Sequence, residues 1–197
     1  MKEKVLIGSG GFAQEVKAHM NNFKMKCFVD DKYFSPNQDN TYLIKDFNPL
    51  KMQALIVVGD PSDRKKIFDS MPLNTEYFTF IHPTVQIMDD NIEVGEGSFI
   101  GANSILTTNI KLGKHALLNR GNHIGHDCLI QDYFSAMPGA IISGNVTIGD
   151  CVYMGTNSSI KEKINVCDKV IIGSNATVVK NITESGTYVG VPAKKIF

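Results

Sequence analysis

The polar residues that could carry out chemistry are concentrated between positions 119 and 128, where His126 is followed directly by Asp127. Acyl transfer from a thioester to an amine or a hydroxyl needs a base with a pKa near neutrality, and histidine supplies one with little tuning. The developing oxyanion needs hydrogen-bond donors, which backbone N–H groups at glycine-rich corners can provide. His126 is therefore the candidate general base, and a purely structural histidine is the alternative.

A glycine-rich segment near the N-terminus, Gly8-Ser9-Gly10-Gly11-Phe12-Ala13, matches the G-x-G-x-x-G/A pattern of phosphate-binding turns. Glycines let the backbone approach a phosphate, and the start of a helix adds unpaired N–H groups. The roughly 80 residues around this segment supply only one of the two mononucleotide-binding halves of a dinucleotide fold. The segment therefore predicts a site for a nucleotide-diphosphate sugar rather than NAD, and a tight turn without a ligand is the alternative.

Two further features could belong to this nucleotide site. Asp30 and Asp31 end a predicted strand and could hydrogen-bond a base or a ribose, although paired acids at the start of a loop are commonly just solvated. Arg64 follows Gly59-Asp60-Pro61 and could bind a phosphate or be a charge on a helix surface. The residues alone leave both questions open.

The elements that must position the glycine-rich segment form a small βαβ domain over residues 1–83. Continuous apolar runs predict buried strands at residues 5–7, 27–29 and 54–58. Helices are predicted at residues 12–22 and 61–71, the second beginning at a proline. The predicted order of strands and helices places the glycine-rich turn between a strand and a helix, as a phosphate site requires.

His126 lies in a different kind of sequence, which repeats every six residues over the predicted second domain, residues 84–197. Sixteen positions, counted in steps of six from Met88 to Val178, are all apolar. A period of six fits a short strand plus a corner, and three such units make one triangular turn. The repeat therefore predicts a parallel β-helix of about five coils with one continuous core. A β-sandwich, the alternative, should show uneven loops and breaks in register.

Small residues accompany the repeat at two fixed positions. Glycines directly follow many of the apolar residues, and we expect them where the strand bends at φ angles closed to other residues. These glycines are Gly95, Gly101, Gly113, Gly125, Gly149, Gly155 and Gly173. Small residues at the fifth position of the unit should fill the inner corners of the coils. They are Ser98, Ser104, Ala116, Ala140, Ser158 and Ala176.

The composition narrows the classes of partner. Twenty Lys and Arg balance twenty Asp and Glu, so no net field attracts nucleic acid or an anionic membrane, and a small molecule is the expected partner. The four cysteines lack metal-type spacing, which favours reduced thiols in a reducing compartment. The first apolar run, Val5-Leu6-Ile7, is too short for a signal peptide or a membrane span. These features predict a cytoplasmic protein.

A zinc site is the alternative chemistry for the histidines. His115, His123 and His126 lie within twelve residues, and some hexapeptide-repeat helices are carbonic anhydrases that use histidine ligands. Those enzymes draw their ligands from successive coils, whereas these histidines are separated by eight and then three residues. We therefore expect no metal.

The whole chain resembles a family of hexapeptide-repeat sugar acetyltransferases, the bacterial nucleotide-aminosugar N-acetyltransferases and sialic-acid O-acetyltransferases. The resemblance is carried by segments in both predicted domains. They are 8–12, 29–31, 59–66, Ile81-His82-Pro83, His126-Asp127-Cys128, Pro138-Gly139-Ala140, Gly144-Asn145-Val146 and 189–194.

The resemblance implies a left-handed helix and a homotrimer with active sites between neighbouring subunits. It implies that His126 is the general base, that Asp127 orients or polarises it, and that the Gly144 N–H donates to the thioester carbonyl. Asn119 corresponds to a polar position near the base. Because successive strand residues point in opposite directions, pairing of His126 with Asp127 requires a corner at this point.

The resemblance also implies the two substrate sites. Residues expected at the nucleotide-sugar site are Gly8, Gly10, Gly11, Phe12, Asp30, Asp31 and Arg64. Residues expected along acetyl-CoA are Ser135, Gly144, Gly155, Gly173, Pro192, Ala193 and Lys194. Some members carry a second histidine nine residues after the base, where this chain has Ser135, so a two-histidine site is in doubt.

The predicted function is acetyl-CoA-dependent N-acetylation of the C4 amine of a nucleotide-linked 4-amino-4,6-dideoxy sugar for surface glycan biosynthesis. One alternative is O-acetylation of a sialic acid or a related sugar. Another, from a different class, is a non-catalytic trimeric protein that binds or senses nucleotide sugars. The expected partners are the nucleotide sugar, acetyl-CoA and further copies of the chain, with no nucleic acid and no membrane.

Overall fold

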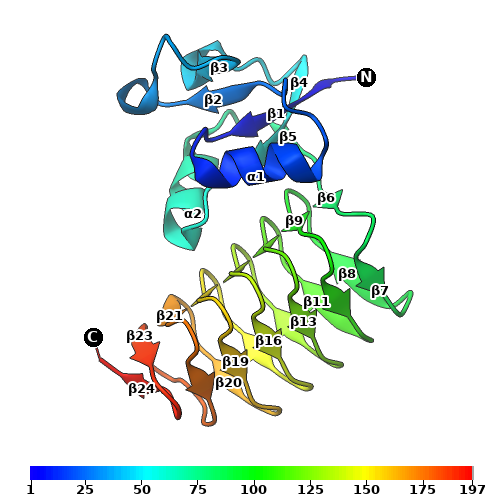
Figure 1. The fold of residues 1–197 in the computed structure, drawn as a ribbon, viewed down its shortest axis with the longest axis vertical. Helices are drawn as coiled ribbons and strands as arrows, with labels where there is room; N and C mark the ends of the chain where they lie inside the picture. Colours follow the sequence, from blue (N-terminus) through cyan, green and yellow to red (C-terminus); the bar gives the residue numbers. More distant parts are fainter. Residues whose placement is uncertain (197) are drawn as a thin grey trace.

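The computed structural model describes residues 1–196 and shows an α/β domain lying against one side of a triangular β-helix (Figure 1). Phe197, the last residue of the predicted second domain, lies outside the described residues. Neither α-helix of this part of the chain is long and apolar enough to cross a bilayer. The two predicted architectures are thus both present.

The N-terminal domain is a five-stranded parallel sheet in the order β3-β2-β1-β4-β5. Its strands are β1 (Glu3–Ile7), β2 (Cys27–Val29), β3 (Thr41–Leu43), β4 (Met52–Ile56) and β5 (Glu76–Tyr77). The helices are α1 (Gly11–His19) and α2 (Pro61–Ser70), with 3-10 turns η1 (Asp31–Tyr33) and η2 (Ile44–Asp46). The three predicted strands and both predicted helices are present, and β3 and β5 were not predicted.

Apolar clusters on both faces of this sheet explain its continuous apolar strands. Leu6 and Leu55 pack with Ala13 and Val16 of α1 on one face. Their neighbours Val5, Ile7 and Ile56 pack on the opposite face. The strand order reverses between β1 and β4, and in parallel α/β sheets ligands bind beyond the carboxyl ends of the strands at such a point.

The β-helix has three faces, which we name by their sheets. Face 1 contains β6 (Phe80–Ile81), β9 (Phe99–Ile100), β12 (Leu117–Leu118), β15 (Ser135–Ala136), β18 (Tyr153–Met154), β21 (Val170–Ile172), β23 (Gly186–Val189) and β24 (Lys194–Lys195). Face 2 contains β7 (Gln86–Ile87), β10 (Ile105–Leu106), β13 (His123–Ile124), β16 (Ile141–Ile142), β19 (Ser159–Ile160) and β22 (Thr177–Val178). Face 3 contains β8 (Ile92–Val94), β11 (Ile110–Leu112), β14 (Leu129–Ile130), β17 (Thr147–Ile148) and β20 (Asn165–Val166). The helix is left-handed, against the usual preference for right-handed crossovers.

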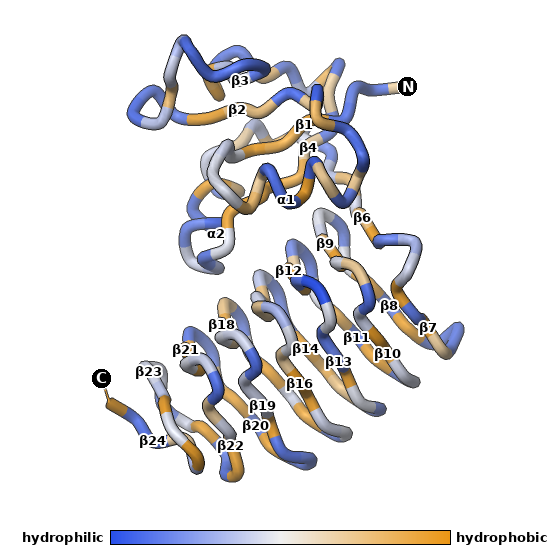
Figure 2. Tube along the Cα trace, in the orientation of Figure 1, coloured by the Kyte–Doolittle hydropathy of each residue, from blue (hydrophilic) through white to orange (hydrophobic). Residues whose placement is uncertain are grey.

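The predicted repeat positions form the core of the helix. The fourteen positions from Ile100 to Val178 are all at most 3% exposed, and the small residues at the fifth position of the unit are buried as well. Figure 2 shows hydrophobic residues recurring along the strands and hydrophilic residues gathering at the corners. Stacking of the coils therefore buries one continuous apolar column, as the repeat predicts.

The register at the start of the helix differs from the prediction. Ile87, not Met88, pairs with Leu106, and Met88 is 60% exposed. One extra residue lies between β7 and β8, where the first coil has only one neighbouring coil to constrain it. The helix also begins before residue 84, because β6 already pairs with β9 although it lacks the apolar repeat.

The glycines of the repeat have a different role from the predicted one. None of those seven adopts a positive φ; the left-handed residues lie two positions later, recurring every six residues from Gly97 to Asn175. A Cβ on Gly95 would instead lie 2.5 Å from the carbonyl carbon of Gly113 in the next coil. Close approach of successive coils, and not backbone conformation, therefore requires glycine at these positions.

Candidate active site at two corners of the helix

His126 and Asp127 form a pair at the corner between faces 2 and 3. Asp127 has the left-handed φ of 58° that recurs at the corners, and this turn places both side chains on one side of the chain. His126 Nδ1 lies 2.7 Å from Asp127 Oδ2. The corner that this pairing requires is therefore present.

Asn109, one coil before Asp127, completes the pair, and sequence reasoning missed it. Its Nδ2 donates to Asp127 Oδ1 at 2.6 Å. The hydrogen bond from Asn109, and secondly that from His126, lower the pKa of Asp127. An ionised Asp127 accepts a hydrogen bond from the Nδ1–H of His126, and in this tautomer the lone pair of Nε2 is free to act as a base. The signal that could have found Asn109 is its separation from Asp127 by one coil of 18 residues.

Gly144 lies one coil after His126, against the imidazole. A Cβ on Gly144 would lie 2.5 Å from His126 Nε2 and 2.7 Å from Cε1. Among the hydrogen bonds between main-chain groups of residues 1–196, none uses the Gly144 N–H. The corner thus combines a base with an unused donor, the two groups that acyl transfer needs.

Five of the seven predicted nucleotide residues meet in a cleft of about 810 Å³ beyond the carboxyl ends of β1 and β4. Its lining includes Gly8, Gly10, Gly11, Phe12 and Asp30. Gly8 has a φ of 117°, which a side chain would strain, and Gly10 precedes α1 without a side-chain cap. The cleft therefore lies at the start of a helix, where main-chain N–H groups favour an anion.

The lining also includes two cations that were not singled out, Lys32 and Lys66. Asp31, by contrast, does not line the cleft; its side chain is 82% exposed and lies 3.9 Å from Lys45 Nζ. The sequence did not separate Asp30 from Asp31, because the 3-10 turn η1 begins between them and rotates the second side chain away.

Arg64 is not available to a phosphate, which corrects its assignment to the nucleotide site. The residue is 1% exposed, and its guanidinium donates to five main-chain carbonyls and to the Ser135 hydroxyl. Ser135 is itself fully buried and donates to the Gly59 carbonyl. Its assignment to acetyl-CoA is therefore wrong as well, since α2 covers it.

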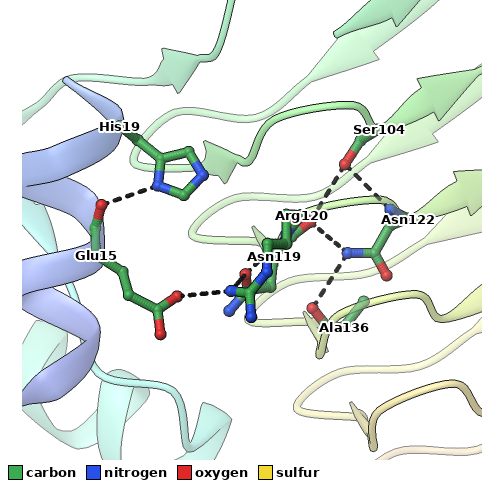
Figure 3. Close-up of polar contacts among 7 residues, drawn as sticks. All are labelled: Glu15, His19, Ser104, Asn119, Arg120, Asn122 and Ala136. Atoms are coloured by element: carbon green, nitrogen blue, oxygen red, sulfur yellow. Dashed lines mark hydrogen bonds and ion pairs between the residues drawn. The ribbon is translucent and has the colours of Figure 1, made fainter. Parts of the chain in front are cut away.

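The remaining predicted residues lie along a second corner, between faces 1 and 2. Asn119, Gly155 and Gly173 each directly follow a strand of face 1. Asn119 is 5% exposed, and its Oδ1 accepts the Arg120 N–H at 2.7 Å, beside the ion pair of Arg120 with Glu15 (Figure 3). The segment 192–194 lies at the C-terminal end of the helix, where the Ala193 N–H donates to the carbonyl of Thr177 in β22.

Within one chain these two corners are separated by the width of face 2, so Asn119 does not lie beside His126. The three histidines considered for a zinc site do not share one environment, because His115 is buried whereas His123 and His126 are exposed. Across residues 1–196, no group of three potential metal ligands is found.

Comparison with known proteins places these features in context. The chain is 27% identical over 175 residues to GDP-perosamine N-acetyltransferase of Escherichia coli O157:H7, covering 81% of this chain and 78% of that protein. It is 29% identical over 116 residues to the probable mitochondrial UDP-3-O-acylglucosamine N-acyltransferase 2 of Arabidopsis thaliana, covering 54% of the chain and 36% of that protein. No family model matches the chain.

Solved structures share the complete fold. WeeI from Acinetobacter baumannii AYE superposes with a TM-score of 0.87 at 25% identity, over 100% of both chains. A mutant perosamine N-acetyltransferase from Caulobacter crescentus, in complex with CoA and GDP-perosamine, superposes with a TM-score of 0.86 at 19% identity, over 100% of this chain and 98% of that one. The second likeness concerns the fold alone.

The β-helix with an N-terminal α/β domain, together with the acyltransferases that the chain resembles, identifies it as an acyltransferase. Within that class, the chain is similar to the hexapeptide-repeat sugar acetyltransferases, GDP-perosamine N-acetyltransferase among them.

Proposed function

We propose that this chain transfers an acetyl group from acetyl-CoA to the C4 amine of a nucleotide-linked 4-amino-4,6-dideoxy sugar, in the biosynthesis of a surface glycan. The observation that carries the proposal is the corner at which Asn109, Asp127 and His126 form one hydrogen-bonded chain beside the unused N–H of Gly144. The relative in Escherichia coli, named for GDP-perosamine, supports an acceptor of this kind.

The chemistry follows from the position of each group. The amine nitrogen of the acceptor attacks the thioester carbon, and His126 Nε2 takes the proton that the nitrogen loses. The Gly144 N–H donates to the oxyanion of the tetrahedral intermediate. The intermediate collapses with cleavage of the C–S bond, and the sulfur leaves as the thiol of CoA after taking the proton from His126. The negative charge of Asp127 stabilises the His126 imidazolium until the proton passes to the sulfur.

The active site needs residues from two copies of the chain, and we propose a homotrimer. The nucleotide cleft lies on the domain that covers face 1, whereas His126 lies at the far edge of face 2. Asn119, Gly155 and Gly173, beside face 1, would meet His126 of a neighbouring copy, with acetyl-CoA between them along Pro192, Ala193 and Lys194.

The four cysteines are all free within the described residues, which supports a reaction in the reducing cytoplasm. The reaction requires no metal, because the base and the oxyanion donor are both groups of the protein.

Thiol release provides the test. The protein is incubated with acetyl-CoA and in turn with UDP-, GDP- and dTDP-linked 4-amino sugars, and with free sialic acid. One thiol should be released per acetamide formed, with a nucleotide amino sugar only. Release with sialic acid would instead assign O-acetylation, and nucleotide-sugar binding without any release would indicate a non-catalytic protein.

Replacement of the base adds a second arm to this test. His126→Ala should fold as the same oligomer and lose about 100- to 10,000-fold in kcat, the usual contribution of a general base. A folded His126→Ala protein with near-normal turnover would contradict the assignment of the base.

A further inference from the structure

Arg64 joins the two domains through a set of hydrogen bonds with both. Toward the β-helix, its Nε donates to the His115 carbonyl at 2.9 Å, and its Nη2 donates to the Tyr133 and Phe134 carbonyls at 2.9 and 3.0 Å. Toward its own domain, Nη1 donates to the Val58 carbonyl at 2.6 Å. One side chain from α2 therefore holds the main chain of both domains at fixed positions.

Burial of an arginine is unfavourable if its only role is to fill the contact between the domains. Burial lowers the pKa of Arg64 to about 10, and its hydrogen-bond partners are carbonyls and one hydroxyl, none of them an anion. Apolar side chains commonly fill such an interface at no loss of stability. What the planar guanidinium adds is geometry, because its donors point in fixed directions.

The β-helix carbonyls that Arg64 binds lie at the start of two successive coils. His115 and Tyr133 occupy the same corner position 18 residues apart, and the coil between them contains both Asn119 and the His126–Asp127 pair. The N-terminal domain is thus anchored to the coil that carries Asn119, in addition to the packing of Phe12 on Phe99 of β9 near the start of the helix.

The other side of Arg64 leads directly to the nucleotide cleft. Gly59, Asp63 and Lys66 line the cleft and surround Arg64 in the chain. The Gly59 carbonyl accepts from Arg64 Nη1 at 3.2 Å and from the Ser135 hydroxyl at 2.8 Å. The wall of the cleft is therefore connected to the β-helix through two buried side chains, Arg64 and Ser135.

We propose that Arg64 is a positioning residue. By holding the nucleotide cleft at a fixed distance from the corners that form the active site, it determines which atom of the acceptor sugar reaches the base. The inference rests on the proposed function. A sugar anchored by its diphosphate then presents only one ring position to the base, so Arg64 helps select an amine at C4 over an amine at C3. Small displacements of a reacting group cost large factors in rate.

The experiment compares Arg64→Met with Lys65→Met, its exposed neighbour on α2, as the matched control. The wild-type protein is first assayed for thiol release, and absence of transfer there would refute the proposed function itself. For Arg64→Met we expect a decrease in kcat of at least about tenfold, and a smaller preference for 4-amino over 3-amino nucleotide sugars. The KM for acetyl-CoA and the affinity for the free nucleoside diphosphate should stay within about twofold of wild type.

Two results would overturn the inference. One is a folded Arg64→Met protein with wild-type kcat and selectivity. The other is a parallel loss of nucleotide affinity, acetyl-CoA affinity and melting temperature, which would show a structural role only. If Arg64→Met does not fold, Arg64→Lys carries the test, because lysine keeps the charge but not the planar set of donors. It should fold and show the same loss of selectivity, and unchanged selectivity would again refute the proposal.

Discussion

The imidazole of His126 lies against the backbone of Gly144 in the next coil, at a distance that leaves no room for a side chain there. A Cβ at residue 144 would lie 2.5 Å from Nε2, the nitrogen that has to receive the proton. In the proposed reaction the glycine therefore has two functions at once: it leaves room for the base, and it provides an N–H that makes no other main-chain hydrogen bond within residues 1–196.

Gly144→Ala should lower turnover without unfolding the protein. The added methyl meets only the exposed imidazole, which can swing away but then leaves its position as a base. We expect kcat to decrease on the order of 10- to 100-fold, with a melting temperature close to that of wild type. Steady-state kinetics and thermal unfolding test this, and a fully active Gly144→Ala protein would argue against both functions of the glycine.

Asp127→Asn should impair the base while leaving it in place. The amide can accept from His126 as Asp127 does, but it does not stabilise the imidazolium with a negative charge. The hydrogen bonds from Asn109 and His126 lower the pKa of Asp127, which keeps its carboxylate ionised near neutral pH. We therefore expect at least about a tenfold loss of kcat, smaller than the loss on removing the base. Wild-type turnover in Asp127→Asn would contradict this role.

His115 should make the protein sensitive to acid. The residue is 1% exposed among Phe68, Tyr77 and Tyr133, and neither ring nitrogen has a hydrogen-bond partner within the described chain. Burial, and secondly the charge of Arg64, lower the pKa of His115 to about 4. A histidine in the unfolded chain has a pKa of about 6.5.

Because the unfolded state binds this proton more readily, protonation favours unfolding. The free energy of unfolding is highest above about pH 6.5, where His115 is neutral in both states, and it decreases as the pH falls toward 4. The loss is on the order of 3 kcal/mol. His115→Phe should remove that dependence, since Tyr133 shows that an aromatic residue fits this left-handed corner. Urea unfolding between pH 7 and 4 measures it, and equal pH slopes for the two proteins would contradict the prediction.

Gly95→Ala should destabilise the helix, although residue 95 is remote from the proposed site. Its Cβ would lie 2.5 Å from main-chain atoms of both Gly113 and Lys114, which cannot rotate away as a side chain can. We expect a loss of about 1–3 kcal/mol, as in other overpacked sites. The control is Gly59→Ala, where nothing lies within 4 Å of the added Cβ. Equal melting temperatures for the two variants would show that the coils can separate locally.

The sequence alone determined the two architectures and the residues of the core. An apolar residue at every sixth position, repeated without a break, favours a strand and a corner repeated around a column. Local reasoning also found the glycine-rich turn and His126, whereas the pairing of His126 with Asp127 was implied by the resemblance to the sugar acetyltransferases.

Only the tertiary structure decided which residues meet across coils and across domains. Asn109, Asp127, His126 and Gly144 are brought together by coils of 18 residues, and one misplaced residue near Met88 shows that such a register is not fixed by local pattern. The residue types of Arg64 and Ser135 do not reveal whether these side chains bind a ligand or bind each other. Their surroundings come from residues some 70 positions apart in the chain, and burial in the contact between domains, which depends on the complete fold, determined their role.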